Sequence, residues 1–151
     1  MEKCDNKSVG VVVQNEYDET LVLSRARFPF GWAGPAGHVD DHGGVEQAAI
    51  DEVFEETGVV VTADQLKKVI DNRRIDNQCR RPGGDHHNWT LYRARINSQE
   101  VTQNLEETLG VRWMPADELA RLALRGSVAN TEGELALEPI WIDFFQELGV
   151  I

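Results

Sequence analysis

The chain has 151 residues, of which 41% are hydrophobic and 27% charged, and this length and composition predict one globular domain, 1–151. Its 26 acidic residues outnumber the 15 Lys and Arg, and the net charge of −11 argues against binding to nucleic acid or to an anionic membrane. Two cysteines make no disulfide framework, no apolar run approaches the roughly 20 residues of a membrane helix, and the first ten residues lack an apolar signal core. We therefore expect a cytoplasmic protein with reduced thiols.

The first part of the chain predicts a hairpin followed by a loop. Residues 8–14 and 21–25 are short apolar segments with β-branched residues, typical of strands, and a polar turn joins them. Residues 27–44 contain two prolines and several glycines. We expect this segment to be a long functional loop.

Residues 45–57 predict a helix, and Gly58 follows where a left-handed C-cap is expected. Its apolar residues recur at intervals of four and predict one buried face, made of Val45, Ala49, Val53, Ile50 and Phe54.

The remaining elements alternate irregularly between strands and helices. Strands are predicted at 59–62, 69–74, 88–96 and 111–114, a turn at 81–85, and helices at 116–124 and 139–148. The last helix is expected to pack through Ile140, Trp141, Phe144, Phe145 and Leu148. This order predicts an α+β fold rather than a strict βαβ alternation.

Charge is distributed unevenly along the chain. Residues 28–66 hold eight acids and no Lys or Arg, whereas residues 67–81 hold six basic residues and two acids, a local charge of +4. One interpretation is a cation site beside an anion site. The other is an acidic helix that faces water and is followed by a basic hairpin.

Four acids crowd into the first predicted helix, opposite its apolar face. Glu52 shares a helical face with Glu55 and Glu56, Asp51 adjoins it, and no Lys or Arg lies three or four residues away. Like charges on one face destabilise a helix, and the helix dipole disfavours acids near its C-terminus. This pattern indicates a site for a divalent cation such as Mg²⁺ or Mn²⁺, which carboxylates bind well.

The helix and the loop before it resemble the Nudix box, G-x5-E-x7-R-E-U-x-E-E-x-G-U, in which U is a bulky apolar residue. The spacing agrees over all 23 positions and seven of the nine specified residues match: Gly37-x5-Gly43-x7-Asp51-Glu52-Val53-Phe54-Glu55-Glu56-Thr57-Gly58-Val59. The flanking segments, Pro35-Ala36-Gly37, Glu106-Glu107 and 111–119, are similar to those of the family. The resemblance covers residues 8–124.

Two positions depart from the box. Gly43 stands in place of its first Glu, and Asp51 in place of its Arg. In the family the Arg helps to orient the neighbouring Glu, and the first Glu contributes to the outer shell of the metal. Glu46, Asp40 and Asp41 are the candidates to take over part of these roles.

The resemblance implies a Nudix-like α/β/α sandwich with a mixed central sheet. It also implies a metal-dependent hydrolase of a nucleoside diphosphate linked to another moiety, with Mg²⁺ or Mn²⁺ as cofactor. Carried over by residue, the implied catalytic set is Glu52, Glu55, Glu56 and Glu107. The implied metal ligands are the three helix glutamates, the Ala36 carbonyl and Glu106. Either Glu106 or Glu107 would complete the metal site or act as the base.

A nucleotide-type substrate also needs binding residues outside the box. Arg73, Arg74, Arg80 and Arg81 are candidates to hold its distal phosphate. The aromatic residues Phe30 and Trp32 either stack on a base or pack under the loop. His38 and His42 have a zinc-like spacing, but no Cys joins them, so they are interpreted as loop or substrate-contact residues.

A second hypothesis is a catalytically weak or inactive nucleotide-binding or regulatory module on the same fold. Gly43 and Asp51 favour this hypothesis, whereas the intact set of three helix glutamates favours the enzyme. The substrate stays open, as does a homodimer. Arg74 stands where ADP-ribose hydrolases carry a proline, and Asn77 where dinucleoside polyphosphate hydrolases carry a tyrosine.

Overall fold

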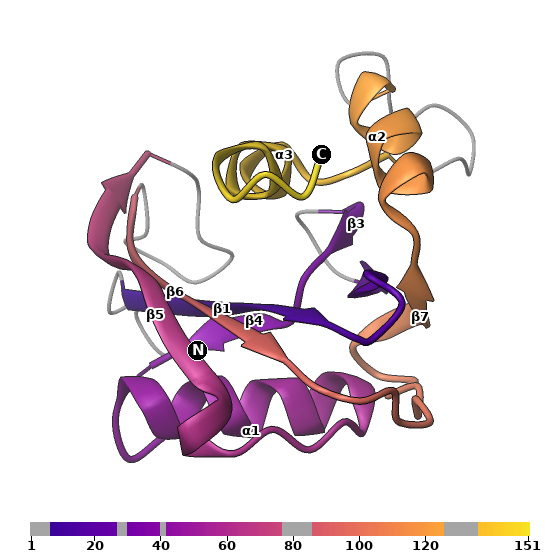
Figure 1. Ribbon diagram of the computed structural model, residues 1–151. Helices are drawn as coiled ribbons and strands as arrows, with labels where there is room; N and C mark the ends of the chain where they lie inside the picture. The colour runs from indigo at the N-terminus through magenta and orange to yellow at the C-terminus, as the bar shows by residue number, and fades with distance from the viewer. Residues whose placement is uncertain (1–6, 27–29, 40–41, 77–85, 126–135) are drawn as a thin grey trace.

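The computed structural model describes residues 7–26, 30–39, 42–76, 86–125 and 136–151 (Figure 1). Its strands are β1 (Lys7–Gln14), β2 (Thr20–Arg25), β3 (Trp32–Ala33), β4 (Ala36–His38), β5 (Leu66–Ile75), β6 (His87–Arg95) and β7 (Thr108–Met114). Its helices are α1 (Val45–Thr57), α2 (Ala116–Leu124) and α3 (Pro139–Glu147), and a 3-10 turn spans Ala63–Gln65. None of the helices formed by the described residues is both long and apolar enough to cross a membrane.

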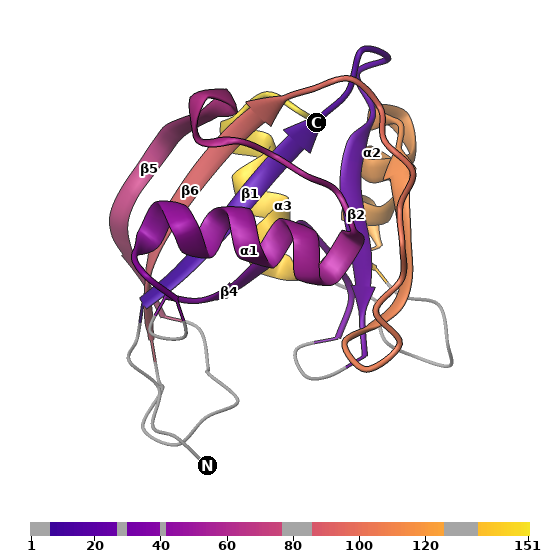
Figure 2. The same ribbon diagram turned by 90° about the horizontal axis from the view of Figure 1, so that it is seen from below.

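The seven strands form one mixed sheet between two helical layers. In the sheet, β1 runs parallel to β6 and antiparallel to β4, and β6 continues antiparallel to β5. On the other side β2 pairs antiparallel with β3 and β7. Helix α1 covers one face of the sheet, and α2 and α3 cover the other, as Figures 1 and 2 show. The predicted α+β sandwich with a mixed central sheet is confirmed.

The alternation of side chains along β1 separates two apolar cores. Val9, Val11 and Val13 join the cluster that packs against α1, and Val12 joins the cluster around α3. This period of two is what a strand buried on both faces requires. Each helical layer therefore rests on its own apolar core, and the sheet holds both layers in fixed positions.

Several predicted elements differ from the structure. The expected hairpin of β1 and β2 is reduced to one pair, Gln14 with Thr20, because β2 pairs along its length with β7 instead. The expected loop at 27–44 contains β3 and β4, which are too short to show a period. Residues 59–62 form no strand, β5 and β7 each begin three residues earlier than expected, and the predicted turn at 81–85 lies outside the described residues.

Helix α1 has its predicted bounds and its left-handed cap at Gly58, where φ is 76°. Its buried face is rotated from the prediction. Phe54 is 56% exposed, whereas Glu56 is only 5% exposed and faces inward. The small side chains of Ala48 and Ala49 are fully buried, so the helix approaches the sheet along this face. Glu56, one of the acids predicted to lie opposite the apolar face, is thus enclosed by the fold.

Glycine is required where β3 turns into β4. A Cβ on Gly34 would lie 2.5 Å from Cζ3 of Trp141, a fully buried ring that packs edge-on against Trp89 and Phe144. Such a ring cannot move without disturbing its neighbours. We expect Gly34→Ala to lower the free energy of unfolding by about 1–3 kcal/mol, measured by urea denaturation. Gly43→Ala is the control, because a Cβ there meets no atom within 4 Å. Equal midpoints for the two variants would contradict this packing.

Candidate active site

Helix α1 directs two of its glutamates toward β4. Glu52 and Glu56 lie one turn apart, so they share the face that the sheet covers. The buried Glu56 carboxylate accepts a hydrogen bond from the backbone N–H of Ala36, with an N–O distance of 2.8 Å. The segment before the helix and the last turn of the helix are therefore joined directly.

Gly37 provides the room that Glu52 occupies. A Cβ on Gly37 would lie 2.2 Å from the carboxyl carbon of Glu52, closer than any real contact allows. The Glu52 side chain is 12% exposed, and its carboxyl group lies against the backbone of β4. The first glycine of the motif is thus explained by the carboxylate that packs over it.

Burial makes these acids hard to ionise. Burial raises the pKa of Glu52 to about 7, and the charges of Glu55 and Glu107 add to the effect. The pKa of Glu56 is raised well above its ordinary value, first by burial and then by Glu52. A bound cation reverses this situation, because a positive charge favours the ionised carboxylates.

Of the two loop acids, Glu107 is the one that acts on the helix glutamates. Its charge raises the pKa of both Glu52 and Glu56, and its side chain is half-buried, whereas Glu106 is exposed. Asn104 fixes this loop: its side chain donates to the carbonyl of Glu55 at 3.2 Å, and its carbonyl accepts from the N–H of Glu107 at 3.1 Å. The structure thus brings Glu107 next to α1. Glu55 is exposed at the rim of the group.

His42 is a further member of the group. Its Nδ1 lies 2.8 Å from Oδ2 of Asp51, its Nε2 lies 3.0 Å from Oε1 of Glu52, and its side chain is 6% exposed. Burial lowers the pKa of His42, but the hydrogen bonds to Glu52 and Asp51 outweigh it and the pKa is raised. Donor atoms of His42, Glu52 and Glu55 lie within 4.8 Å of one another, close enough to share a metal ion. The sequence predicts only a loop or substrate-contact role for His42, because nothing local shows its two partners.

Of the three acids proposed to take over part of the missing roles, the structure describes Glu46 alone. Glu46 is exposed in the first turn of α1, and Asp40 and Asp41 lie outside the described residues. His38, the other half of the zinc-like spacing, does not belong to the group of His42, Glu52 and Glu55, which is the group among the described residues that could hold a metal ion.

Arg25, on β2, extends the group toward α3. Its charge lowers the pKa of Glu56 and also that of Glu138, whose Oε2 lies 4.0 Å from Nε of Arg25. Burial raises the pKa of Glu138 to about 7 in spite of that charge. Neither residue was expected at the site, because both are distant from α1 in sequence.

Glu138 gives the free energy of unfolding a pH dependence. Its pKa rises from 4.5 to about 7 on folding, so the folded chain keeps a proton that the unfolded chain releases, and stability falls as the pH rises through this interval. We expect Glu138→Gln to be more stable than the wild type by roughly 1–3 kcal/mol at about pH 8, with the advantage vanishing near about pH 4. Urea denaturation at several pH values in the presence of EDTA measures this.

The matched control is Glu147→Gln. A hydrogen bond from Arg73 lowers the pKa of Glu147, so removing that carboxylate should instead reduce stability above its ordinary pKa. If both variants had the same sign at about pH 8, burial would not be raising the pKa of Glu138 on folding.

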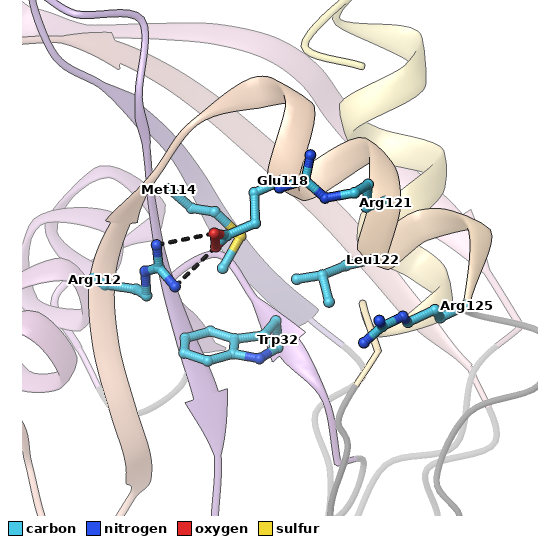
Figure 3. Close-up of a pocket in the computed structure, with 7 residues that line it drawn as sticks. All are labelled: Trp32, Arg112, Met114, Glu118, Arg121, Leu122 and Arg125. Carbon is cyan, nitrogen blue, oxygen red and sulfur yellow. Dashed lines mark hydrogen bonds and ion pairs between the residues drawn. The ribbon is translucent and has the colours of Figure 1, made fainter.

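The structure places Trp32 in a cleft of about 300 Å³ on the α2 side of the sheet (Figure 3). Its other lining residues come from β7 and from α2 with its C-cap: Arg112, Met114, Glu118, Arg121, Leu122 and Arg125. Nη1 of Arg112 pairs with Oε2 of Glu118 at 2.8 Å. Three arginines and one glutamate line the cleft, and Arg121 also pairs with Asp117 at 3.4 Å, so the lining keeps a net positive charge in an otherwise acidic chain. Phe30, nearby in sequence, is 47% exposed.

Of the four arginines predicted to bind phosphate, the two that the structure describes pair with other acids rather than with the helix glutamates. Arg73 forms a double hydrogen bond with Glu147 on α3, at 2.6 and 2.9 Å. Arg74 pairs with Asp76 at 3.2 Å. Arg80 and Arg81 lie outside the described residues. Contact of these arginines with a substrate stays a prediction.

Comparison with known proteins gives consistent matches. The family model of the NUDIX domain matches residues 5–133. Nudix hydrolase 25 of Arabidopsis thaliana is 29% identical over 134 residues, which cover 78% of this chain and 76% of that protein.

Solved structures agree with the fold. The NUDIX domain of Shewanella oneidensis NrtR, solved with ADP ribose, superposes with a TM-score of 0.72 at 17% identity over 99% of this chain and 88% of that one. A C. elegans Ap4A hydrolase superposes with a TM-score of 0.63 at 21% identity over 94% of this chain and 96% of that one. The chain belongs to the NUDIX family, the family of the Nudix-type pyrophosphohydrolases.

Proposed function

We propose that this chain hydrolyses the pyrophosphate bond of a nucleoside diphosphate linked to another moiety, with Mg²⁺ or Mn²⁺ bound by the glutamates of α1. The observation that carries the proposal is the gathering of Glu52 and Glu56 against β4, where the charge of Glu107 acts on both and Glu55 lies at the rim. The similarity of this chain to two proteins named as hydrolases supports the reaction type: the Arabidopsis protein is named a Nudix hydrolase, and the C. elegans protein an Ap4A hydrolase.

The residues present fit a divalent cation. The donors are carboxylate oxygens, together with the proposed Ala36 carbonyl and Glu106, and hard cations prefer such oxygens. The raised pKa values of Glu52 and Glu56 mean that burial outweighs the compensation that His42 and Arg25 provide, and a cation would supply further positive charge. When bound, such a cation neutralises the diphosphate and lowers the pKa of a water molecule.

The chain's own residues would then carry the remaining tasks. Glu107, half-buried beside the helix glutamates, is the proposed base that accepts a proton from the attacking water. Arg25, whose charge acts on Glu56, would favour the ionised form of that carboxylate. Arg25 is the last residue of β2, and Glu107 directly precedes β7, the strand that pairs with β2. One end of this strand pair would therefore hold both the base and the positive charge.

The cleft beside Trp32 is the proposed site for part of the nucleotide. Trp32 and Ala36 are four residues apart, a distance of at most about 14 Å along an extended chain, so one substrate could reach both. The indole offers a stacking surface, and Arg112, Arg121 and Arg125 offer positive charge to an anionic part of the substrate. Phe30 remains a second candidate for stacking.

Arg80 and Arg81 also remain proposed phosphate contacts. Neutralising both with Gln should raise KM more than it lowers kcat, because contacts made equally in the ground and transition states affect binding alone. Steady-state kinetics over a range of substrate concentrations would measure the two constants. Unchanged kinetics would assign these arginines to the solvated surface.

The alternative is a nucleotide-binding module without turnover, which the departures at Gly43 and Asp51 favour. The test is a panel of nucleoside diphosphate derivatives with Mg²⁺ or Mn²⁺, coupled to phosphatase and read as released phosphate. Hydrolysis of at least one member supports the enzyme. Binding detected by calorimetry without hydrolysis of any member supports the module.

A further inference from the structure

We propose that His42, held by Asp51, positions the carboxylate of Glu52, and that this pair takes the place of the basic residue that the motif has at position 51. The inference rests on the proposed function, because it assigns a role to Glu52 at a metal site. His42 is thus a positioning residue rather than a catalytic one.

The ring of His42 is held from both sides. Nδ1 contacts Oδ2 of Asp51 at 2.8 Å and Nε2 contacts Oε1 of Glu52 at 3.0 Å, so rotation of the ring would break both hydrogen bonds. The side chain is 6% exposed, and that of Glu52 is 12% exposed. A fixed imidazole of this kind orients a ligating carboxylate, because the hydrogen bond restricts where its oxygens point.

Asp51 is itself anchored. Its second oxygen, Oδ1, accepts a hydrogen bond of 2.7 Å from Nε2 of Gln47, one turn earlier on α1. The backbone of His42 is fixed as well, since its N–H donates to the carbonyl of Val39 at 3.1 Å, and Val39 is bound in turn to Lys7 of β1. A continuous chain of contacts therefore runs from Gln47 through Asp51 and His42 to Glu52.

This arrangement explains how an acid is tolerated at position 51. Without His42, Glu52 would lose the hydrogen bond that orients its carboxylate. His42 supplies a ring nitrogen to each of them. The hydrogen-bond partner of Glu52 thus comes from the loop before α1, rather than from the helix itself.

His42 could instead ligate a metal directly, since its donor atom lies within 4.8 Å of those of Glu52 and Glu55. The present contacts favour positioning, because both ring nitrogens are already engaged by carboxylates. The two roles differ in whether a ring nitrogen is bonded to the ion, and electron paramagnetic resonance of bound Mn²⁺ distinguishes them.

The experiment measures Mn²⁺ affinity, kcat and KM for His42→Ala, His42→Gln, Asp51→Ala and the double variant His42→Ala/Asp51→Ala. His86→Ala, outside the group, is the matched histidine control. We expect His42→Ala to weaken Mn²⁺ binding and lower kcat by about 10- to 100-fold, with KM unchanged. His42→Gln, which keeps a donor, should recover part of the loss. Circular dichroism and thermal melting show whether each variant is folded.

The double variant tests the order of the contacts. If Asp51 acts through His42, Asp51→Ala should be harmful alone but add nothing to His42→Ala. Additive losses, unchanged affinity and kcat in both His42 variants, or direct coupling between bound Mn²⁺ and a histidine nitrogen in the wild type would each overturn the proposal. A wild type that neither binds Mn²⁺ nor hydrolyses any member of the panel would instead overturn the proposed function.

Discussion

Glu56→Gln is expected to abolish hydrolysis and to leave the fold intact. The amide oxygen of Gln can still accept the hydrogen bond from Ala36, and burial, which raises the pKa of Glu56, already disfavours a charge at this position, so an uncharged amide should fit the metal-free fold. The negative charge that a metal needs is lost, however. Because metal stabilisation of the transition state is worth several kcal/mol, we expect kcat to fall by about 10³-fold or more, or roughly 4 kcal/mol.

The measurement is kcat with saturating Mn²⁺, combined with the melting temperature without metal. Glu100→Gln, which removes an exposed acid outside α1, is the control for the change in net charge. A Glu56→Gln protein that is folded and keeps more than about a tenth of the wild-type kcat, a cost below about 1.4 kcal/mol, would show that this carboxylate is not part of the reaction.

Gly37→Ala is expected to damage activity far more than stability. A methyl group there would lie 2.2 Å from the carboxyl carbon of Glu52, and the flexible end of that side chain can move aside at little cost to the fold. The carboxylate would then be displaced from its position over β4. Since misplacement of a reacting group by about 1 Å can cost about 10²-fold in rate, we expect a loss of this size in kcat.

Gly43→Ala is the matched control, because a Cβ at Gly43 meets nothing within 4 Å. Kinetics and melting temperatures of the two variants separate a local displacement from general destabilisation. Equal kcat values for Gly37→Ala and Gly43→Ala would mean that the position of Glu52 does not matter. A melting temperature that falls steeply for Gly37→Ala alone would mean that the backbone, rather than the carboxylate, gives way.

The helices and the family could be predicted from the sequence alone. Helices α1 and α2 have their predicted bounds because apolar spacing and a terminal glycine or proline are local signals. The short strands β3 and β4 were missed because two or three residues show no period. The pairing of β2 with β7 was missed because it joins segments that are far apart in the chain.

The candidate site was predictable in its residue types but not in its environment. Periodicity predicts Glu56 opposite the apolar face and Phe54 within it, whereas the face that the sheet covers is rotated, so that Glu56 is buried and Phe54 is exposed. The contacts of His42, and the approach of Arg25 to Glu138, depend on tertiary structure alone. Likewise, the arginines of the Trp32 cleft come from β7 and α2, which no local pattern connects to the motif.

The most direct measurement is the rate of pyrophosphate-bond hydrolysis as a function of Mn²⁺ concentration, with Mn²⁺ occupancy measured in the same samples by electron paramagnetic resonance. We expect the rate to follow occupancy of the site at the α1 glutamates and to vanish with EDTA, and both signals to be lost in Glu56→Gln. Undiminished turnover in EDTA, or full Mn²⁺ occupancy without hydrolysis of any nucleoside diphosphate derivative tested, would contradict the proposal.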